Sequence, residues 1–175
     1  MGLRDAAVVA VMSDAMLRVG EASALDAGDI VRADDGTGRV MMARSKTDPE
    51  GEGAALYLRA STVARVDAWL AAAKHHDGPL FRPVTRGGRA QSSRLSPRSV
   101  RAVVASAAAA IGVVGASGHS LRIGAAQSLV RNGAELPDAM LAGRWKSPTM
   151  PVRYARSELA CRGAVARLRP EADLD

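Results

Sequence analysis

The sequence RWKSPTMPVRYARSE, residues 144–158, places a tyrosine among cations. Tyr154 directly follows Arg153 and lies two residues before Arg156, and Glu158 is the one acid of the segment. Such a tyrosine is either an amphipathic residue with a packed ring and a solvated hydroxyl, or a nucleophile that faces a polyanion. Because a phenol with a pKa of about 10 is a poor nucleophile at neutral pH, the second role requires cations that stabilise charge on a phosphate.

Two more cations occupy positions where chemistry is possible. Arg18 ends an apolar run in MLRVGE, and Glu21 follows it by three residues. An arginine this close to core-forming residues requires a partner, and Glu21 or Asp14 is within reach at helical spacing. Taken alone, a structural ion pair is the simpler interpretation. Lys46, in ARSKTD, lies at the mouth of a predicted hairpin, where a solvated surface lysine is the ordinary interpretation.

The sequence GHSLR places His119 and Arg122 three residues apart at the start of a predicted helix, so their side chains project from one face. A lone histidine is more often structural than catalytic, but a histidine and an arginine at a helix N-terminus suit a phosphate. From this motif alone both interpretations stay open. Trp145 by itself is more often a core residue than a contact residue.

The positive charge, +6 in total, is unevenly distributed along the chain. Residues 78–134 contain eight arginines and no acid, and residues 144–169 contain seven basic residues and one acid, whereas the first 35 residues contain seven acids and three arginines. Coding bias accounts for arginine in place of lysine but not for the acid-free stretch. The asymmetry therefore favours binding to nucleic acid. Five aromatic residues are few for a protein that stacks single-stranded bases, so double-stranded DNA is the expected partner.

The length and composition suit one domain with a core of its own, at 175 residues. The single cysteine, Cys161, excludes an internal disulfide and a cysteine-rich zinc site. No apolar run reaches 18 residues, and the N-terminus lacks a basic stretch that leads into an apolar one. We therefore expect a soluble protein of a reducing compartment such as the cytoplasm, without a membrane span or a signal peptide.

Hydrophobic spacing and turn signals predict a mostly helical α+β domain with a small three-stranded antiparallel sheet inserted early. Helices are expected over 5–17 and 19–26. The turn clusters DDGTG and TDPEGEG then separate three short strands, expected over 28–32, 39–45 and 54–59.

Later helices are expected to begin at Ser61 or Thr62, at Ser96, near His119 and at Pro137, and a last one is expected over 157–168. An arginine-rich loop separates the first two of these. The buried positions of the helix from Ser96 are expected to be Val100, Val103, Val104, Ala107 and Ile111, and those of the helix near His119 are expected to be Leu121, Ala125 and Leu129.

The segments MLRVGEASAL, SKTDPEGEG, GHSLRIGAAQSL and GRWKSPTMPVRYAR, in that order, resemble the motifs of the tyrosine recombinase (phage integrase) family. The resemblance covers about residues 15–157. Any single motif is weak, whereas six polar positions in register with the expected helices and hairpin are specific. The resemblance implies the tyrosine recombinase catalytic-domain fold and the catalytic residues Arg18, Lys46, His119, Arg122, Trp145 and Tyr154, with Glu21 as an orienting residue.

The resemblance also implies the reaction. The Tyr154 hydroxyl attacks a DNA phosphodiester and forms a 3′-phosphotyrosyl bond, while Arg18 and Arg122 hold the nonbridging oxygens. Lys46 protonates the departing 5′-oxygen, His119 assists proton movement, and Trp145 packs the site. No metal, ATP or other cofactor is required, because the guanidinium groups supply the charge.

The implied organisation is a catalytic domain over 1–157 and a C-terminal helix or tail over 158–175. The N-terminal core-binding domain that is usual in the family is absent from this sequence, and tryptophan replaces the commoner histidine at position 145. Self-association on DNA through the C-terminal segment, as a tetrameric synapse, is a further expectation. Packing of that segment within its own chain is the alternative.

Further DNA contacts are expected from basic residues near the motifs. The alternatives to a recombinase are a non-catalytic DNA-binding module of the same fold and a type IB topoisomerase-like activity that relaxes supercoils. Integration, excision, resolution and transposition by a phage or another mobile element share this domain. The candidate DNA-contact residues are Arg44, Arg86, Arg94, Arg98, Arg144, Lys146 and Arg153.

Overall fold

The computed structural model describes residues 2–42 and 53–156. The chain divides into two compact units, which meet in the sequence between Leu121 and Arg122. Each unit has a hydrophobic cluster of its own. Within the described ranges, no helix is both long and apolar enough to cross a membrane.

The first unit begins with two helices and a sheet. Its elements are α1 (Leu3–Asp14), α2 (Val19–Ala24), the 3-10 turn η1 (Ala27–Asp29), β1 (Ile30–Arg32), β2 (Gly38–Met42), β3 (Ala54–Leu58), α3 (Ala60–Ala73) and α4 (Pro97–Ala109). The strands pair antiparallel in the order β1-β2-β3, with Val40 opposite both Ile30 and Leu56. The predicted three-stranded sheet is therefore confirmed, although the predicted strand residues 43–45 lie outside the described ranges.

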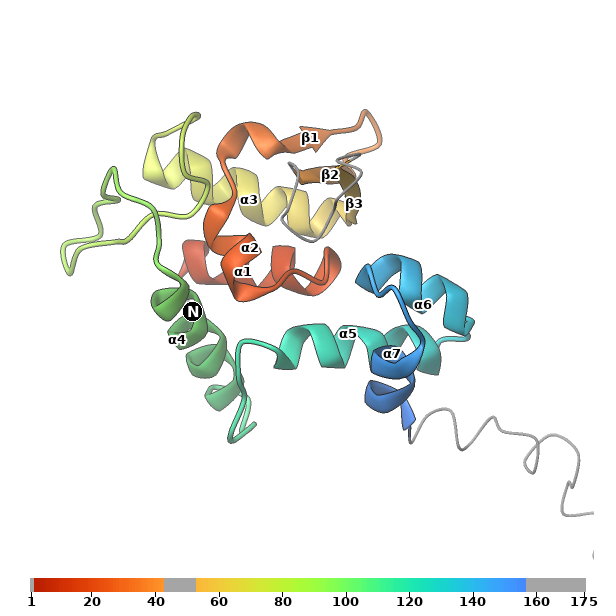
Figure 1. The fold of residues 1–175 in the computed structure, drawn as a ribbon. Helices are drawn as coiled ribbons and strands as arrows, with labels where there is room; N and C mark the ends of the chain where they lie inside the picture. The colour runs from red at the N-terminus through yellow and green to blue at the C-terminus, as the bar shows by residue number, and fades with distance from the viewer. Residues whose placement is uncertain (1, 43–52, 157–175) are drawn as a thin grey trace, which may run out of the picture. The chain divides into compact units, whose positions relative to one another are not determined.

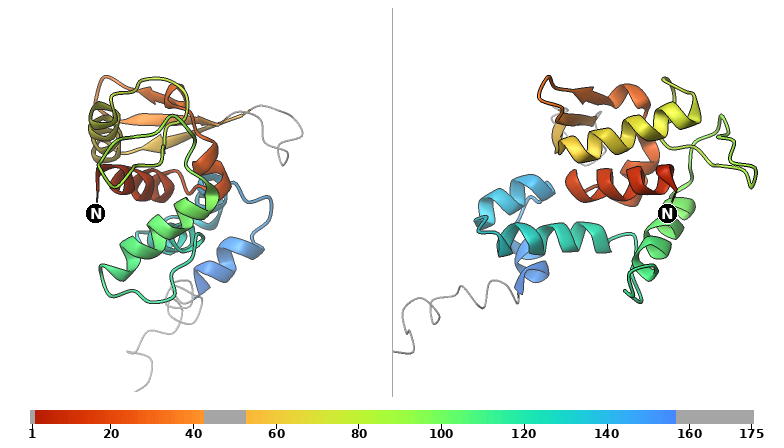
Figure 2. Two further views of the ribbon diagram at one scale, coloured as in Figure 1. Left: turned by 90° about the vertical axis from the view of Figure 1, so that its left-hand side faces the viewer. Right: turned by 180° about the vertical axis from the view of Figure 1, so that it is seen from behind.

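The core of this unit lies between the sheet and two helices. Figures 1 and 2 show α1 and α3 side by side, with the sheet beside them. Val40 and Leu58 from the sheet, Val11 from α1 and Val66 from α3 are fully buried in one cluster. Alternation along the strands and helical spacing in α1 and α3 place these residues on the inner faces.

The start of α3 differs from the prediction. The N-cap is Arg59, not Ser61 or Thr62, because Asp14 at the end of α1 accepts hydrogen bonds from the Arg59 backbone and side chain and from the Thr62 hydroxyl. Burial alone raises the pKa of Asp14, but these hydrogen bonds outweigh burial and hold the pKa below its ordinary value. A carboxylate from another helix thus caps α3.

The helix α4 begins as predicted. The Ser96 side chain caps it by accepting a hydrogen bond from the Ser99 N–H, and Pro97 occupies the first turn. Val100, Val103 and Val104 are buried. Ile111 is not, because the helix ends at Ala109 and the side chain is 79% exposed, so this part of the predicted apolar stripe is wrong.

The second unit is small and helical. It contains most of α5 (Ser120–Arg131), together with α6 (Leu136–Gly143) and α7 (Thr149–Tyr154), and α6 packs on α7. Its core cluster is Val130, Ala139 and Ala155. The predicted set of buried residues in α5 is wrong, because the buried positions lie one residue later in the sequence. Leu121, Ala125 and Leu129 are only partly buried, whereas the fully buried positions are Arg122, Ala126 and Val130.

Candidate active site

A turn with a strained backbone connects α1 to α2 and positions Arg18 at the start of α2. The Leu17 N–H returns to the Met12 carbonyl, and Met16 between α1 and Arg18 has φ 48°, a left-handed conformation that glycine usually provides at such a helix end. Met16 and Leu17 are buried, so packing holds the turn in place. The chain therefore places Arg18 at the N-cap of α2 with its side chain exposed.

Glu21 fixes Arg18 from two directions. One carboxylate oxygen accepts the Arg18 backbone N–H at 2.7 Å, and the other accepts from the guanidinium at 2.8 Å. The Arg18 side chain is 44% exposed and that of Glu21 is 14% exposed. The partner expected at helical spacing is thus Glu21, because Asp14 is occupied by Arg59 and Thr62. The exposed guanidinium keeps a defined direction while part of it faces solvent.

His119 lies in a turn that two serines organise. The Ser117 hydroxyl accepts the His119 backbone N–H at 3.2 Å, and the Ser120 hydroxyl accepts the Ser117 N–H at 2.8 Å. These two hydrogen bonds close the turn that leads into α5. Gly118 is needed beside it, because a Cβ there would lie 2.2 Å from the nearest methyl of Val19. The turn therefore packs directly on the start of α2.

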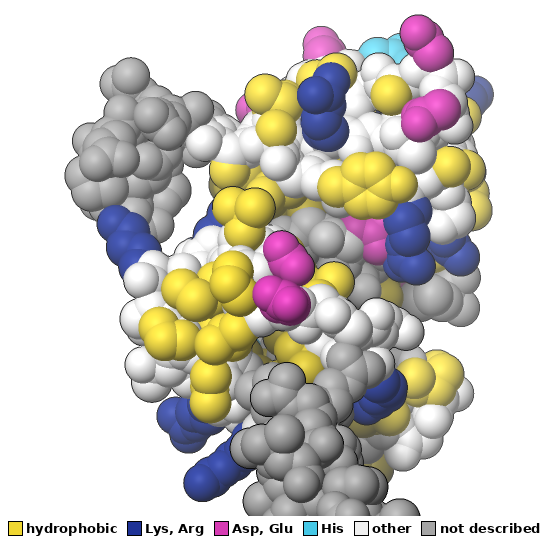
Figure 3. Space-filling model, turned by 90° about the vertical axis from the view of Figure 1, so that its right-hand side faces the viewer, with side chains coloured by type: hydrophobic (Ala, Val, Ile, Leu, Met, Phe, Trp, Pro, Cys, Tyr) yellow, Lys and Arg dark blue, Asp and Glu magenta, His cyan; other side chains and the backbone are white. Residues whose placement is uncertain are grey.

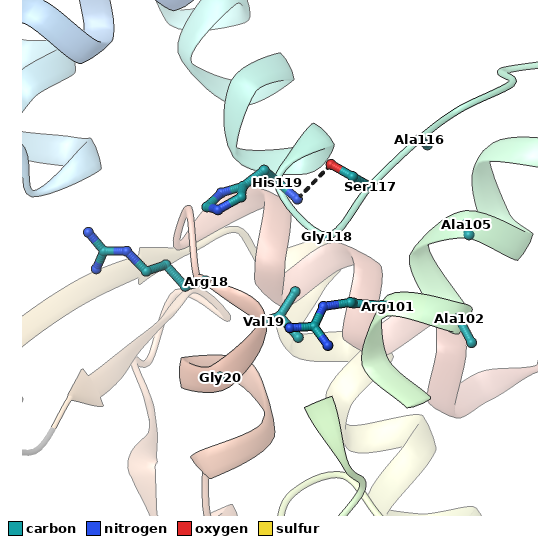
Figure 4. Close-up of a pocket in the computed structure, with 10 residues that line it drawn as sticks. All are labelled: Arg18, Val19, Gly20, Arg101, Ala102, Ala105, Ala116, Ser117, Gly118 and His119. Carbon is teal, nitrogen blue, oxygen red and sulfur yellow. Dashed lines mark hydrogen bonds between the residues drawn. The ribbon is translucent and has the colours of Figure 1, made fainter. Parts of the chain in front are cut away.

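Arg18 and His119 line one open hollow of about 600 Å³ in the first unit. Figure 4 shows their side chains extending toward the same side, while Arg101 reaches from α4 to the region of Val19. The structure thus brings together three predicted site residues of this unit, Arg18, Glu21 and His119. Guanidinium and imidazole groups around an open hollow are suited to an anion such as phosphate.

In the second unit, Arg122 is almost completely buried. Its guanidinium donates to the Gly143 carbonyl, and its Cζ lies 4.6 Å from the centre of the Trp145 ring. A guanidinium over an indole face is a cation–π contact, which is stronger when water is excluded. Gly143 is required here because a Cβ would lie 2.1–2.5 Å from three atoms of the Trp145 ring.

Tyr154 belongs to the same cluster. Its ring centre lies 5.8 Å from that of Trp145, with an angle of 59° between the planes, and the Gln127 amide donates to the Tyr154 carbonyl at 3.1 Å. Tyr154 ends α7 and is half-buried. The second unit thus joins Arg122, Trp145 and Tyr154, which are the other three catalytic residues predicted within the described ranges.

The predicted DNA-contact residues have different surroundings. The Arg94 guanidinium donates to the carbonyls of Ser23, Ala24 and Leu25 and to the Asp26 carboxylate, so it is committed to the C-terminal end of α2. The others within the described ranges are Arg86, Arg98, Lys146 and Arg153, which are exposed, and Arg144, which is partly buried with φ 52°.

Two predicted residues, Lys46 and Arg44, lie outside the described ranges.

Figure 3 shows, on the face that it draws, lysine and arginine side chains at the surface among hydrophobic ones. Sequence reasoning missed Arg101 and Gly143 as site residues. The spacing of Arg101 from the buried valines of α4 predicted a surface position for this residue. It did not predict that Arg101 lines the same hollow as His119.

Comparison with known proteins shows the family to which this chain belongs. The profile of the phage integrase family matches residues 1–160. The chain belongs to the phage integrase family. Within this family it is 29% identical to the recombinase Cre of Escherichia phage P1 over 186 residues, which cover 98% of this chain and 54% of Cre. It is 31% identical over 161 residues to an integrase/recombinase XerD homolog of Selenomonas ruminantium, with 87% of this chain and 47% of that protein covered.

Solved structures of recombinases share the fold. The XerA recombinase aligns with a TM-score of 0.70 at 19% identity and covers 97% of this chain and 58% of XerA. The XerH site-specific recombinase, in a post-cleavage complex with a palindromic difH substrate, aligns with a TM-score of 0.69 at 19% identity and covers 98% of this chain and 46% of XerH. The predicted tyrosine recombinase fold is therefore confirmed. The chain spans about half the length of the curated relatives that it matches.

Proposed function

We propose that this chain is the catalytic part of a site-specific DNA recombinase that cleaves and rejoins strands through a 3′-phosphotyrosyl intermediate. The observation that carries the proposal is the cluster of Arg122, Trp145 and Tyr154, in which a phenol lies beside a ring that a guanidinium covers. Membership of the phage integrase family and the DNA-bound state of the XerH neighbour support it.

In the proposed reaction, the Tyr154 oxygen attacks phosphorus and loses its proton, and the bond from phosphorus to the 5′-oxygen breaks. Lys46 donates the proton that the departing 5′-hydroxyl requires. Arg18 and Arg122 hold the nonbridging oxygens, and His119 assists proton movement at the phosphate or at Tyr154, where it can accept the phenol proton. A 5′-hydroxyl from a second strand then reverses the step, so the energy of the phosphodiester bond is kept. The proposal requires both arginines to act on one phosphate.

The surroundings of the two arginines support their role as preorganised charges. Glu21 directs the exposed Arg18, while Gly143 and Trp145 hold Arg122. Because guanidinium groups stay protonated at all working pH values, they stabilise the phosphate without a bound cation. We therefore propose that cleavage needs neither metal nor ATP, and that the partner is double-stranded DNA with several copies of the chain assembled on it.

Replacement of the nucleophile tests the proposal. A duplex that carries the cognate site, with a nick next to the scissile phosphate, traps the covalent intermediate as an SDS-stable adduct. Tyr154→Phe is expected to bind this duplex with unchanged affinity and to form no adduct. The matched control is Tyr57→Phe, because Tyr57 is the only other tyrosine and lies 58% exposed on β3, and it is expected to form adduct at the normal rate in EDTA without ATP.

Adduct formation by Tyr154→Phe would remove Tyr154 from the role of nucleophile. If the unaltered chain binds DNA and never forms an adduct, the chain is a binding module of this fold and not a recombinase. Adduct formation together with plasmid relaxation, but without joining of two sites, would indicate the topoisomerase-like activity instead.

A further inference from the structure

A second arginine, Arg101, lies in the hollow that Arg18 and His119 line. Arg101 projects from α4, in the first unit, and Ala102 and Ala105 of the same helix line the hollow beside it. Figure 4 shows its guanidinium near Val19, at the start of α2. No sequence motif marks Arg101, and the proposed reaction does not use it.

The charges around the hollow favour a role for Arg101. Glu21 directs both of its carboxylate oxygens to Arg18 and so balances that charge locally. Among the described residues, no acidic side chain lines the hollow and none forms an ion pair with Arg101. The uncompensated positive charge at this place therefore comes from Arg101. An anion that enters the hollow meets one net cation in addition to the Arg18–Glu21 pair.

The ordinary alternative is that Arg101, like Arg98, is simply a solvated arginine on the exposed face of α4. The packing at Gly118 argues against this alternative. A Cβ at Gly118 would lie 3.3 Å from Cγ of Arg101, so the aliphatic stem of the arginine lies against the backbone next to His119. A stem that is held on one side has fewer conformations to lose when the guanidinium binds a ligand.

We infer that Arg101 binds a backbone phosphate of DNA in the hollow that Arg18 and His119 line. The inference rests on the proposed function for the identity of the ligand. A phosphate contact by a guanidinium adds affinity that does not depend on the base sequence. Arg101 is thus a binding residue that holds the strand, and the chemical step belongs to the groups named above.

The salt dependence of DNA affinity tests this inference, and a random-sequence duplex serves as the probe because phosphate contacts do not read bases. Arg101→Met keeps the stem and removes the charge. The slope of log affinity against log salt is expected to become shallower by about 0.9, and the affinity at about 0.1 M salt is expected to fall about eightfold, as for one lost phosphate contact. Arg101→Lys is expected to restore the slope.

The matched control is Arg65→Met, because Arg65 is an exposed arginine of the same unit that binds the Ser61 carbonyl within α3. It is expected to leave the slope unchanged, and thermal unfolding should be alike for all the variants. An unchanged slope in Arg101→Met would overturn the inference. An equal loss in Arg65→Met, or a slope that Arg101→Lys does not restore, would also overturn it.

The inference about Arg101 and the proposed recombinase function can fail independently of each other. If the unaltered chain forms the Tyr154 adduct and Arg101→Met keeps the full slope, only the role of Arg101 is lost. If Arg101→Met has the shallower slope but the unaltered chain never forms an adduct, the phosphate site stands and the recombinase activity is overturned.

Discussion

Arg18 and Arg122 carry the same guanidinium group in different surroundings. Arg18 is 44% exposed and is directed by a carboxylate three residues away, whereas Arg122 is 2% exposed and lies between the Gly143 carbonyl and the Trp145 ring. An exposed ion pair contributes little to stability, because water competes with it. A buried guanidinium that holds a carbonyl and an aromatic face is part of the core of its unit. The two arginines should therefore differ in what their loss does to folding.

Replacement of each arginine by methionine gives the largest expected difference. Arg122→Met leaves the Gly143 carbonyl without this donor and removes the cation–π contact, which together cost about 2–4 kcal/mol. Hydrogen exchange of the amides in 122–156 should therefore accelerate by a factor of about 30–800 at 25 °C. Arg18→Met should change exchange in 2–42 by less than about fivefold. Similar exchange in the two variants would remove the proposed difference between the units.

Gly143→Ala tests the second unit without removing a charge. The added Cβ would overlap the Trp145 ring, so the ring must move away from Arg122, at an expected cost of about 1–3 kcal/mol. The matched control is Gly124→Ala in α5, where a Cβ meets nothing within 4 Å and the helix should gain about 0.5–1 kcal/mol. Exchange in 122–156 measures both variants. A destabilisation of equal size in the two variants would mean that the ring contact is not the cause.

A smaller effect of pH should separate the units, because all three histidines of the chain lie in the first one. Burial lowers the pKa of His75, and the nearby Arg82 lowers the pKa further. The unfolded chain takes up this proton at a pH of about 6.5, and the folded unit takes it up only at lower pH. The stability of the first unit should therefore fall as the pH falls below about 6.5.

His75→Phe should flatten this dependence, as measured by amide exchange in 2–42 between pH 7 and pH 5 after correction for the intrinsic rates. The matched control is His76→Gln, because His76 is exposed, and it should leave the dependence unchanged. A pH dependence that persists in His75→Phe would assign the effect to another group.

The sequence predicted the elements better than their contacts. Helical spacing and the Ser96-Pro97 cap predicted α4, and the turn clusters predicted the sheet. The N-cap of α3 was not predictable from local residues, because the carboxylate of Asp14 that determines it lies 45 positions earlier in the chain. Local sequence does not reveal a cap that another helix supplies.

In the candidate site, too, contacts between residues close in the sequence were predictable and contacts between distant residues were not. The spacing predicted an ion pair of Arg18 with Glu21 or Asp14, and the structure shows the pair with Glu21. The burial of Arg122 was not predicted, because a charged residue is normally assigned to the solvent side of a helix, and only Gly143 and Trp145, more than 20 residues later, explain its position. Arg101 has neither a motif nor an unusual spacing, and the fold alone places it next to His119.

The commitment of Arg94 to α2 has a consequence for engineering. Six residues are too few for a helix to persist by itself. Arg94, at the far end of the loop that follows α3, therefore helps to keep in shape the helix on which Glu21 sits. Loop grafting intended to retarget such a protein would remove this support if it replaced Arg94, and the loss of activity would then be mistaken for poor recognition of the new sequence. Grafts that retain Arg94 together with Asp26 avoid that confusion.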